Sequence, residues 1–367
     1  MAQPTSRLLV RLALAAMAIV VVATLFIGPS SSAITYLVVD LATLEQGSSA
    51  VVRGPNAAGD AVGGGRVAGV AGARRGLLFT RGGVQAISGL SGSDYTTVFG
   101  INDVGDAVGS SNTTTAVRAF RTTRAGAIGE LPPLAGDTAS TAFAVNKRGQ
   151  AVGFSSGRGG EQAVLWAADN SVTALPGASG AQASRALGIN ELGDAVGSLT
   201  TGFGLHAIRW PSGGSEQDLG TLPGHTTSEA VAVNARGDTV GYSADPVGGR
   251  RAVLWPSGGT IVDLGTLPGG DVSQSLGIND AGDVVGVSTS AQGSRAFIWT
   301  RTAALRDLND LIAPSAFVLT QAVGINAAGV IVAIGRDVGH TNGAGGHDDG
   351  HESPLRIFLL LPSGAQP

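Results

Sequence analysis

The stretch GINDAGDVVG, residues 277–286, decides the fold, because versions of it recur along almost the whole chain. Successive copies place an asparagine at intervals of 46, 44, 44, 44, 45 and 47 residues. Seven copies at one period indicate a repeat protein in which each copy is one supersecondary unit. The asparagines are Asn56, Asn102, Asn146, Asn190, Asn234, Asn279 and Asn326.

Two further phrases follow the asparagine in a fixed order. The first resembles R-A-V-L-W, as at residues 251–255, and the second resembles D-L-G-T-L-P-G, as at residues 263–269. Every tryptophan of the chain occupies the last slot of the first phrase, so we expect these side chains to form the core between neighbouring units. They are Trp166, Trp210, Trp255 and Trp299.

The phrases predict four short strands in each unit. Asparagine suits the first position of a type I turn, and the glycine three residues later supplies a left-handed residue, so N-x-x-G predicts a hairpin. A second hairpin joins the tryptophan run to the strand after it, as across residues 256–259. Four strands in 44 to 47 residues match one blade of a β-propeller.

The two ends of the chain predict a closed ring. The run YLVVDLATL, residues 36–44, reads as the last strand of a unit, whereas RIFLLL, residues 356–361, reads as a third strand with no successor. We therefore expect residues 35–41 to pair with residues 356–361. The expected fold is an all-β, seven-bladed β-propeller over residues 34–362, closed by the N-terminal strand in the last blade, with a short tail at residues 363–367.

The first 33 residues have the layout of a secretory signal peptide. Arg7 and Arg11 precede an uncharged apolar run over residues 12–27, and small residues stand at 31–33. The alternative is an uncleaved membrane anchor, since the run approaches the shortest spanning length. Either reading predicts a secreted or envelope protein that contacts a membrane only through this segment.

Composition excludes several classes of function. The chain has no cysteine, so it has no disulfide or thiolate metal site. Lys147 is the only lysine, and the formal net charge is −4, so a P-loop is excluded and nucleic acid is not an expected partner. We expect a monomer that carries no cofactor.

The phrases resemble the bacterial extracellular HAF-repeat family, named for a His-Ala-Phe signature. His206-Ala207-Ile208 comes closest, and Arg118-Ala119-Phe120 and Arg295-Ala296-Phe297 replace the histidine. The resemblance covers the chain from Tyr36 to about Leu361 and implies an extracellular location and a repeat architecture. It implies no activity and no catalytic residues.

Two local patterns suggest chemistry. Gly153-Phe154-Ser155-Ser156-Gly157 fits G-x-S-x-G, but it lies in a repeated strand where a nucleophile elbow needs a strand-to-helix turn. The insertion at residues 337–354 carries His347, Asp349 and His351, which are candidate metal ligands. A flexible polar loop is the competing interpretation of this Gly/His/Asp-rich segment.

Two series of carboxylates recur once per unit. They suggest a ring of cation ligands or, in the interpretation we favour, side chains that hydrogen-bond backbone groups of each blade. No charged or aromatic cluster appears unique to one blade, which argues against a single specialised pocket. The first series is Asp60, Asp106, Asp194, Asp238 and Asp283, and the second is Asp40, Asp218, Asp263 and Asp307.

The sequence favours a binding module over an enzyme. The blades have similar sequences, and none of them carries a residue that we assign to catalysis. This pattern favours an exported protein that binds a glycan or another protein. The alternatives are a hydrolase or lyase that uses the axial pocket of the ring, and a purely structural surface protein.

Overall fold

The structure is a computed structural model that describes residues 35–45, 51–66, 75–177, 181–338 and 354–363. The predicted signal segment at 1–33 and the metal candidates His347, Asp349 and His351 lie outside these residues. The interpretation of 337–354 as a flexible and dispensable loop therefore stays a prediction. Within the described part of the chain, no helix has the length and apolar character needed to span a bilayer.

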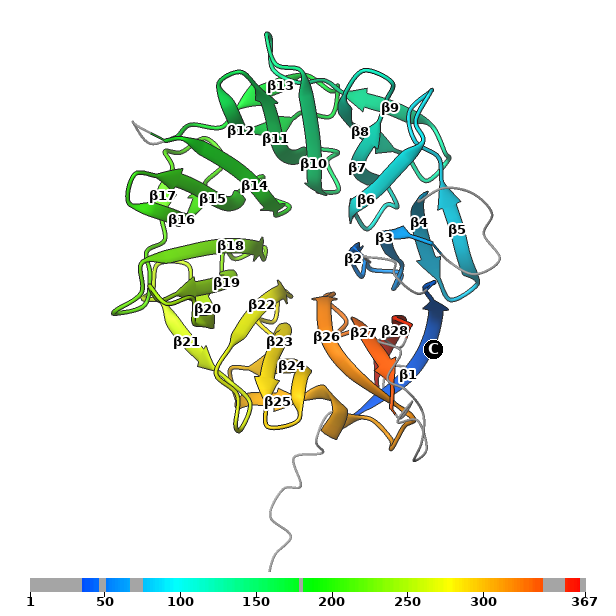
Figure 1. Ribbon diagram of the computed structural model, residues 1–367, viewed down its shortest axis with the longest axis vertical. Coiled ribbons are helices and arrows are strands. Elements are labelled where there is room, and N and C mark those ends of the chain that lie inside the picture. The colour runs from blue at the N-terminus through cyan, green and yellow to red at the C-terminus, as the bar shows by residue number, and fades with distance from the viewer. Residues whose placement is uncertain (1–34, 46–50, 67–74, 178–180, 339–353, 364–367) are drawn as a thin grey trace, which may run out of the picture. The chain divides into compact units, whose positions relative to one another are not determined.

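The described residues form seven four-stranded antiparallel sheets, which are the blades of a propeller (Figure 1). This confirms the fold expected from the repeat. Blade 1 is β2 (Val51–Arg53), β3 (Ala61–Gly65), β4 (Arg75–Thr80) and β5 (Gly83–Ile87); blade 2 is β6 (Tyr95–Ile101), β7 (Ala107–Asn112), β8 (Val117–Thr122) and β9 (Ile128–Leu131); blade 3 is β10 (Ala139–Val145), β11 (Ala151–Gly157), β12 (Gly160–Trp166) and β13 (Val172–Ala174); blade 4 is β14 (Ala183–Ile189), β15 (Ala195–Thr201), β16 (Gly204–Trp210) and β17 (Gln217–Asp218). Blade 5 is β18 (Thr227–Val233), β19 (Thr239–Ala244), β20 (Arg250–Trp255) and β21 (Val262–Gly265); blade 6 is β22 (Ser273–Ile278), β23 (Val284–Ser290), β24 (Gly293–Thr300) and β25 (Ala303–Asp307), followed by the 3₁₀ helix η1 (Leu308–Leu311); blade 7 is β26 (Phe317–Ile325), β27 (Ile331–Asp337), β28 (Arg356–Pro362) and β1 (Tyr36–Thr43).

The N-terminal strand closes the ring as the repeat predicts. β1 pairs antiparallel with β28, from Tyr36 opposite Pro362 to Thr43 opposite Arg356, and Figure 1 shows the blue and red strands side by side. Arg356 also forms an ion pair with Asp40 across this pair of strands. The two ends of the chain therefore share blade 7, and no linear stack of repeats would need that arrangement.

The asparagine of each repeat links one blade to the next. Its Oδ1 accepts from backbone N–H groups of its own turn, as Asn190 does from Leu192 at 3.0 Å, which is the role the sequence predicts. Its Nδ2 in addition donates to the backbone carbonyl of the asparagine in the next blade. The donors Asn56, Asn102, Asn146, Asn190, Asn234, Asn279 and Asn326 lie 2.9 to 3.4 Å from these acceptors, and Asn326 closes the circle onto Asn56.

The tryptophans pack between blades. Trp166 and Trp210 are buried, and their indole N–H groups donate to Pro132 and Pro176 of the preceding blades at 2.7 and 2.6 Å. Trp255 is buried too, while Trp299 is half-buried. The predicted interblade position is therefore confirmed, and it is tightest in blades 3 and 4.

Candidate functional site

The two ends of the strands form two different faces of the ring. We call the end that carries the seven N-x-x-G turns the turn face, and the opposite end the loop face. The described connections between second and third strands lie on the loop face, and their lengths vary from residues 158–159 in blade 3 to residues 245–249 in blade 5. Variable loops on a rigid scaffold are where binding residues concentrate, so the loop face is the candidate binding face.

A cavity of about 560 Å³ lies on the axis of the ring. All seven innermost strands line it: β2, β6, β10, β14, β18, β22 and β26, which face the centre in Figure 1. Its walls are formed by the residues of these strands that precede the asparagine turns. The volume falls in the range of small-ligand pockets.

A β-bulge in the innermost strand sets one lining position. The register of β6 against β7 shifts between Val98 and Gly100, and the same shift occurs in the innermost strands of blades 3 to 7. The extra residue of such a bulge is re-aimed away from the regular ladder, and here it faces the cavity. In blades 2 to 7 this position, three residues before the asparagine, holds Phe99, Phe143, Leu187, Val231, Leu276 and Val323. Blade 1 has no such shift in register, and Arg53 occupies the equivalent position there.

The cavity walls differ from blade to blade. Phe99 and Phe143 form an edge-to-face pair with ring centroids 5.3 Å apart, and Phe143 also lies 5.8 Å from Phe154. The wall next to blades 2 and 3 is therefore aromatic, whereas aliphatic side chains occupy the equivalent positions in blades 4 to 7. The aromatic cluster spans blades 2 and 3, and comparison of single blades in the sequence does not identify it.

Charges in the cavity are also unevenly placed. Among the described residues that line it, the charged side chains are Arg53, Arg185 and Glu229. Arg185 forms a bidentate ion pair with Glu161, and that carboxylate raises the pKa of the Arg185 guanidinium. Glu229 accepts from Ser198 at 3.2 Å.

Of the two arginines in the described cavity lining, Arg53 is the one without a carboxylate partner. Its guanidinium donates to the carbonyl of Val52 at 2.9 Å, which uses one of five N–H donors. Burial by the surrounding walls lowers the pKa of Arg53, and no neighbouring charge contributes to that change. The side chain nevertheless stays accessible to solvent through the cavity.

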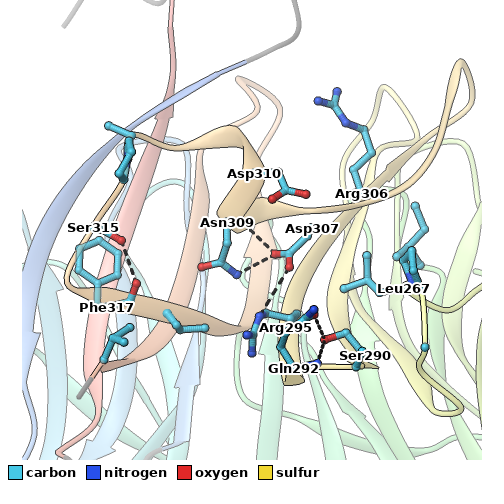
Figure 2. Close-up of a pocket in the computed structure, with 18 residues that line it drawn as sticks. Leu267, Ser290, Gln292, Arg295, Arg306, Asp307, Asn309, Asp310, Ser315 and Phe317 are labelled. Atoms are coloured by element: carbon cyan, nitrogen blue, oxygen red, sulfur yellow. Dashed lines mark hydrogen bonds and ion pairs between the residues drawn. The ribbon is translucent and has the colours of Figure 1, made fainter. Parts of the chain in front are cut away.

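A second cavity, of about 970 Å³, lies between blades 6 and 7 on the loop face (Figure 2). Asp307 occupies its wall, where it caps η1 through the N–H of Asn309 at 2.8 Å and pairs with Arg295 at 3.7 Å. Arg306 and Asp310 lie at its upper edge in Figure 2. The charged side chains of Asp307 and Arg295 in its wall thus already pair with each other and with η1.

The G-x-S-x-G sequence is structural. Ser155 is fully buried in β11, accepts from the N–H of Leu134 at 2.9 Å and donates to Asp137 at 2.6 Å. A Cβ on Gly153 would lie 1.9 Å from the carbonyl oxygen of Thr141, so the glycine is required by the neighbouring strand. The structure supports the interpretation of a repeated strand over that of a nucleophile elbow.

The first carboxylate series stabilises turns. Asp194 accepts from Asn190, from the N–H of Ser212 at 2.9 Å and from Arg209 at 2.8 Å. These hydrogen bonds outweigh burial and hold the pKa of Asp194 below its ordinary value, and Asp238 has the same lowered pKa through equivalent contacts. These carboxylates mainly hold turns of their own blades, as the favoured interpretation expects, and Asp238 also accepts from Arg301 of blade 6 at 3.0 Å.

Three members of the second series, Asp40, Asp218 and Asp307, pair with the Arg or His slot of the R-A-F phrase. His206 Nδ1 lies 2.8 Å from Asp218, and Arg295 lies 3.7 Å from Asp307. Both partners stand on adjacent third and fourth strands. This slot of the R-A-F phrase thus has a structural role within the blade.

No group of three or more His, Asp or Glu side chains suited to a metal gathers within the described residues. The residues that do form a site, Arg53, Phe99, Phe143, Arg185 and Glu229, were missed by the sequence reasoning. They stand immediately before the repeated G-I-N phrase, where the copies differ. Aligning the seven asparagines and comparing the positions three and five residues earlier would have revealed them.

Comparisons with known proteins show the fold alone. No model of a protein family and no curated protein matches the chain. The structure is similar to the β-propeller domain of the Trilobed protease from Pyrococcus furiosus (TM-score 0.51, 10% identity, covering 86% of this chain and 94% of that chain). It is also similar to a virginiamycin B lyase from Staphylococcus aureus with quinupristin (0.50, 11%, 89% and 99%) and to YCF48 bound to D1 peptide (0.50, 8%, 91% and 97%).

Proposed function

We propose that this protein is an exported binding module that takes a glycan or a protein ligand in its axial cavity. The observation that carries the proposal is the contrast between the repeated frame and the blade-specific cavity wall. Side chains that merely hold a ring together have no need to differ between blades, as the asparagines show. The residues that line the cavity do differ.

The composition of the cavity supports binding over two-carboxylate hydrolysis. Glycoside hydrolases commonly use a pair of Asp or Glu residues that flank the scissile bond. Among the described residues lining the cavity, Glu229 is the single carboxylate, and Ser198 and Tyr242 hold it. Burial together with the charge of Glu229 raises the pKa of the Tyr242 hydroxyl, which keeps that phenol a hydrogen-bond donor.

A ligand screen with two matched variants tests the proposal. The protein without residues 1–33 is probed on glycan and protein arrays, in parallel with Leu276→Trp, which fills the cavity, and Arg148→Gln on the turn face. We expect a ligand that Arg148→Gln retains and Leu276→Trp loses, with unchanged melting temperatures for both variants. Equal binding by Leu276→Trp, or hydrolytic or lyase turnover that depends on Glu229, contradicts the proposal.

A further inference from the structure

We propose that the axial cavity binds an acidic sugar, and that the carboxylate of this sugar pairs with the guanidinium of Arg53. The inference rests on the proposed function, because it names the ligand class of the same cavity. The cavity offers three features that such a sugar needs: a free cation, an aromatic wall and room for one or two sugar rings.

Arg53 supplies the cation. Its planar guanidinium suits bidentate pairing with a carboxylate, and among the described residues its one hydrogen bond is to the Val52 carbonyl. Arg53 is exposed to solvent within the cavity, so a bound carboxylate can reach its remaining N–H donors.

The other charges facing the cavity do not neutralise Arg53. Arg185 is committed to Glu161 through two hydrogen bonds. Glu229 also interacts with Arg185, since it contributes to the raised pKa of that guanidinium. Arg53 is therefore the group in the described lining that still needs a negative partner.

The aromatic pair stands beside Arg53 in the ring. Phe99 holds the position in blade 2 that Arg53 holds in blade 1, and Phe143 follows in blade 3. The apolar face of a pyranose ring packs on such side chains, while Gln274 across the cavity offers an amide for its hydroxyl groups. A volume of about 560 Å³ accommodates a mono- or disaccharide.

An acidic peptide fits the same cavity less well. Peptides that add to a sheet need a regular strand edge, but bulges interrupt the innermost strands of blades 2 to 7. The cavity is also lined by seven converging strands, so an extended peptide has no straight groove to follow. The observations thus favour a compact sugar carrying a carboxylate.

Calorimetric titration of the protein without residues 1–33 tests the proposal. The probes are galacturonate and glucuronate dimers, their neutral galactose and glucose counterparts, and a hexapeptide with a free or an amidated C-terminus. We expect a uronate dimer to bind at least about tenfold more tightly than its neutral counterpart. Arg53→Gln removes that preference, Arg53→Lys restores part of it, and Arg148→Gln changes nothing.

The outcomes separate this inference from the proposed function. The inference of an acidic ligand is wrong if the neutral sugar binds as tightly as the uronate and Arg53→Gln binds both as the wild type does. If Leu276→Trp abolishes binding in the same experiment, the cavity is still the binding site and the proposed function stands. Preference for the free-carboxylate peptide over every uronate also overturns the inference. Loss of all binding in Arg53→Gln supports the inference only if the melting temperature of this variant equals that of the wild type. If the melting temperature changes, binding by Arg53→Lys decides instead.

Discussion

The asparagine turns and the walls of the axial cavity are made by the same innermost strands, yet they differ in how much their residues vary. On the turn face, one asparagine per blade repeats the same contacts seven times and closes a circle of hydrogen bonds. In the axial cavity, three residues before the asparagine, equivalent positions hold Arg53, Phe99 and Leu276. The comparison teaches that positions with the same residue in every blade hold the ring together. Positions whose residues differ between blades give the cavity its specific chemistry.

Removing the closing strand tests the frame most severely. Deleting residues 34–44 from the protein without its first 33 residues leaves β28 as an open apolar edge, which invites pairing with other chains. We expect aggregated or strongly destabilised protein, measured by size-exclusion chromatography and thermal melting. A soluble ring with the melting temperature of the parent protein would contradict closure through β1.

Truncating an interblade tryptophan should have the next largest effect. Trp166→Ala removes a fully buried side chain and its hydrogen bond to Pro132. We expect a loss of about 3–5 kcal/mol in the free energy of unfolding, measured by denaturant titration. A denaturant midpoint equal to that of the wild type would show that the slot does not belong to the core.

One asparagine of the turn face can be compared with an asparagine on the loop face. Asn190→Ala removes buried hydrogen bonds within blade 4 and to blade 5, and we expect a loss of about 2–3 kcal/mol. Asn112→Ala, at the exposed end of β7, should stay within about 0.5 kcal/mol of the wild type. Equal losses in the two variants would remove the distinction between the faces.

Acid should weaken the turn face first. The pKa values of Asp194 and Asp238 are lowered in the folded state, so their stabilisation is complete above the unfolded value of about 4 and is lost as pH falls through the folded values. Asp238→Asn should reduce the pH dependence of the melting temperature below about pH 4. An unchanged slope would mean that Asp238 has the same pKa in both states.

The smallest effect is expected on the loop face. Phe203 is 92% exposed in the turn between β15 and β16, so Phe203→Ser should change the free energy of unfolding by less than about 0.5 kcal/mol. Chemical denaturation measures this directly. A larger loss would show that this loop is part of the frame.

The sequence by itself determined the repeat, the number of blades, the hairpin turns and the closing strand. Each of these depends on local spacing, such as the interval between Asn146 and Asn190, or on the phase of the repeat at the two ends. It also indicated that Ser155 belongs to a repeated strand, because serine recurs at that slot. These features follow from turn chemistry and strand pairing, which adjacent residues specify.

Only the tertiary structure decided which side chains meet on the axis. Arg53, Phe99 and Phe143 are separated by about one repeat each in the chain, and a bulge in an innermost strand aims each phenylalanine inward. The asparagine Nδ2 contacts, including Asn326 to Asn56, likewise join residues far apart in sequence. Ring closure brings equivalent positions of all blades to one axis, and no local pattern encodes that convergence.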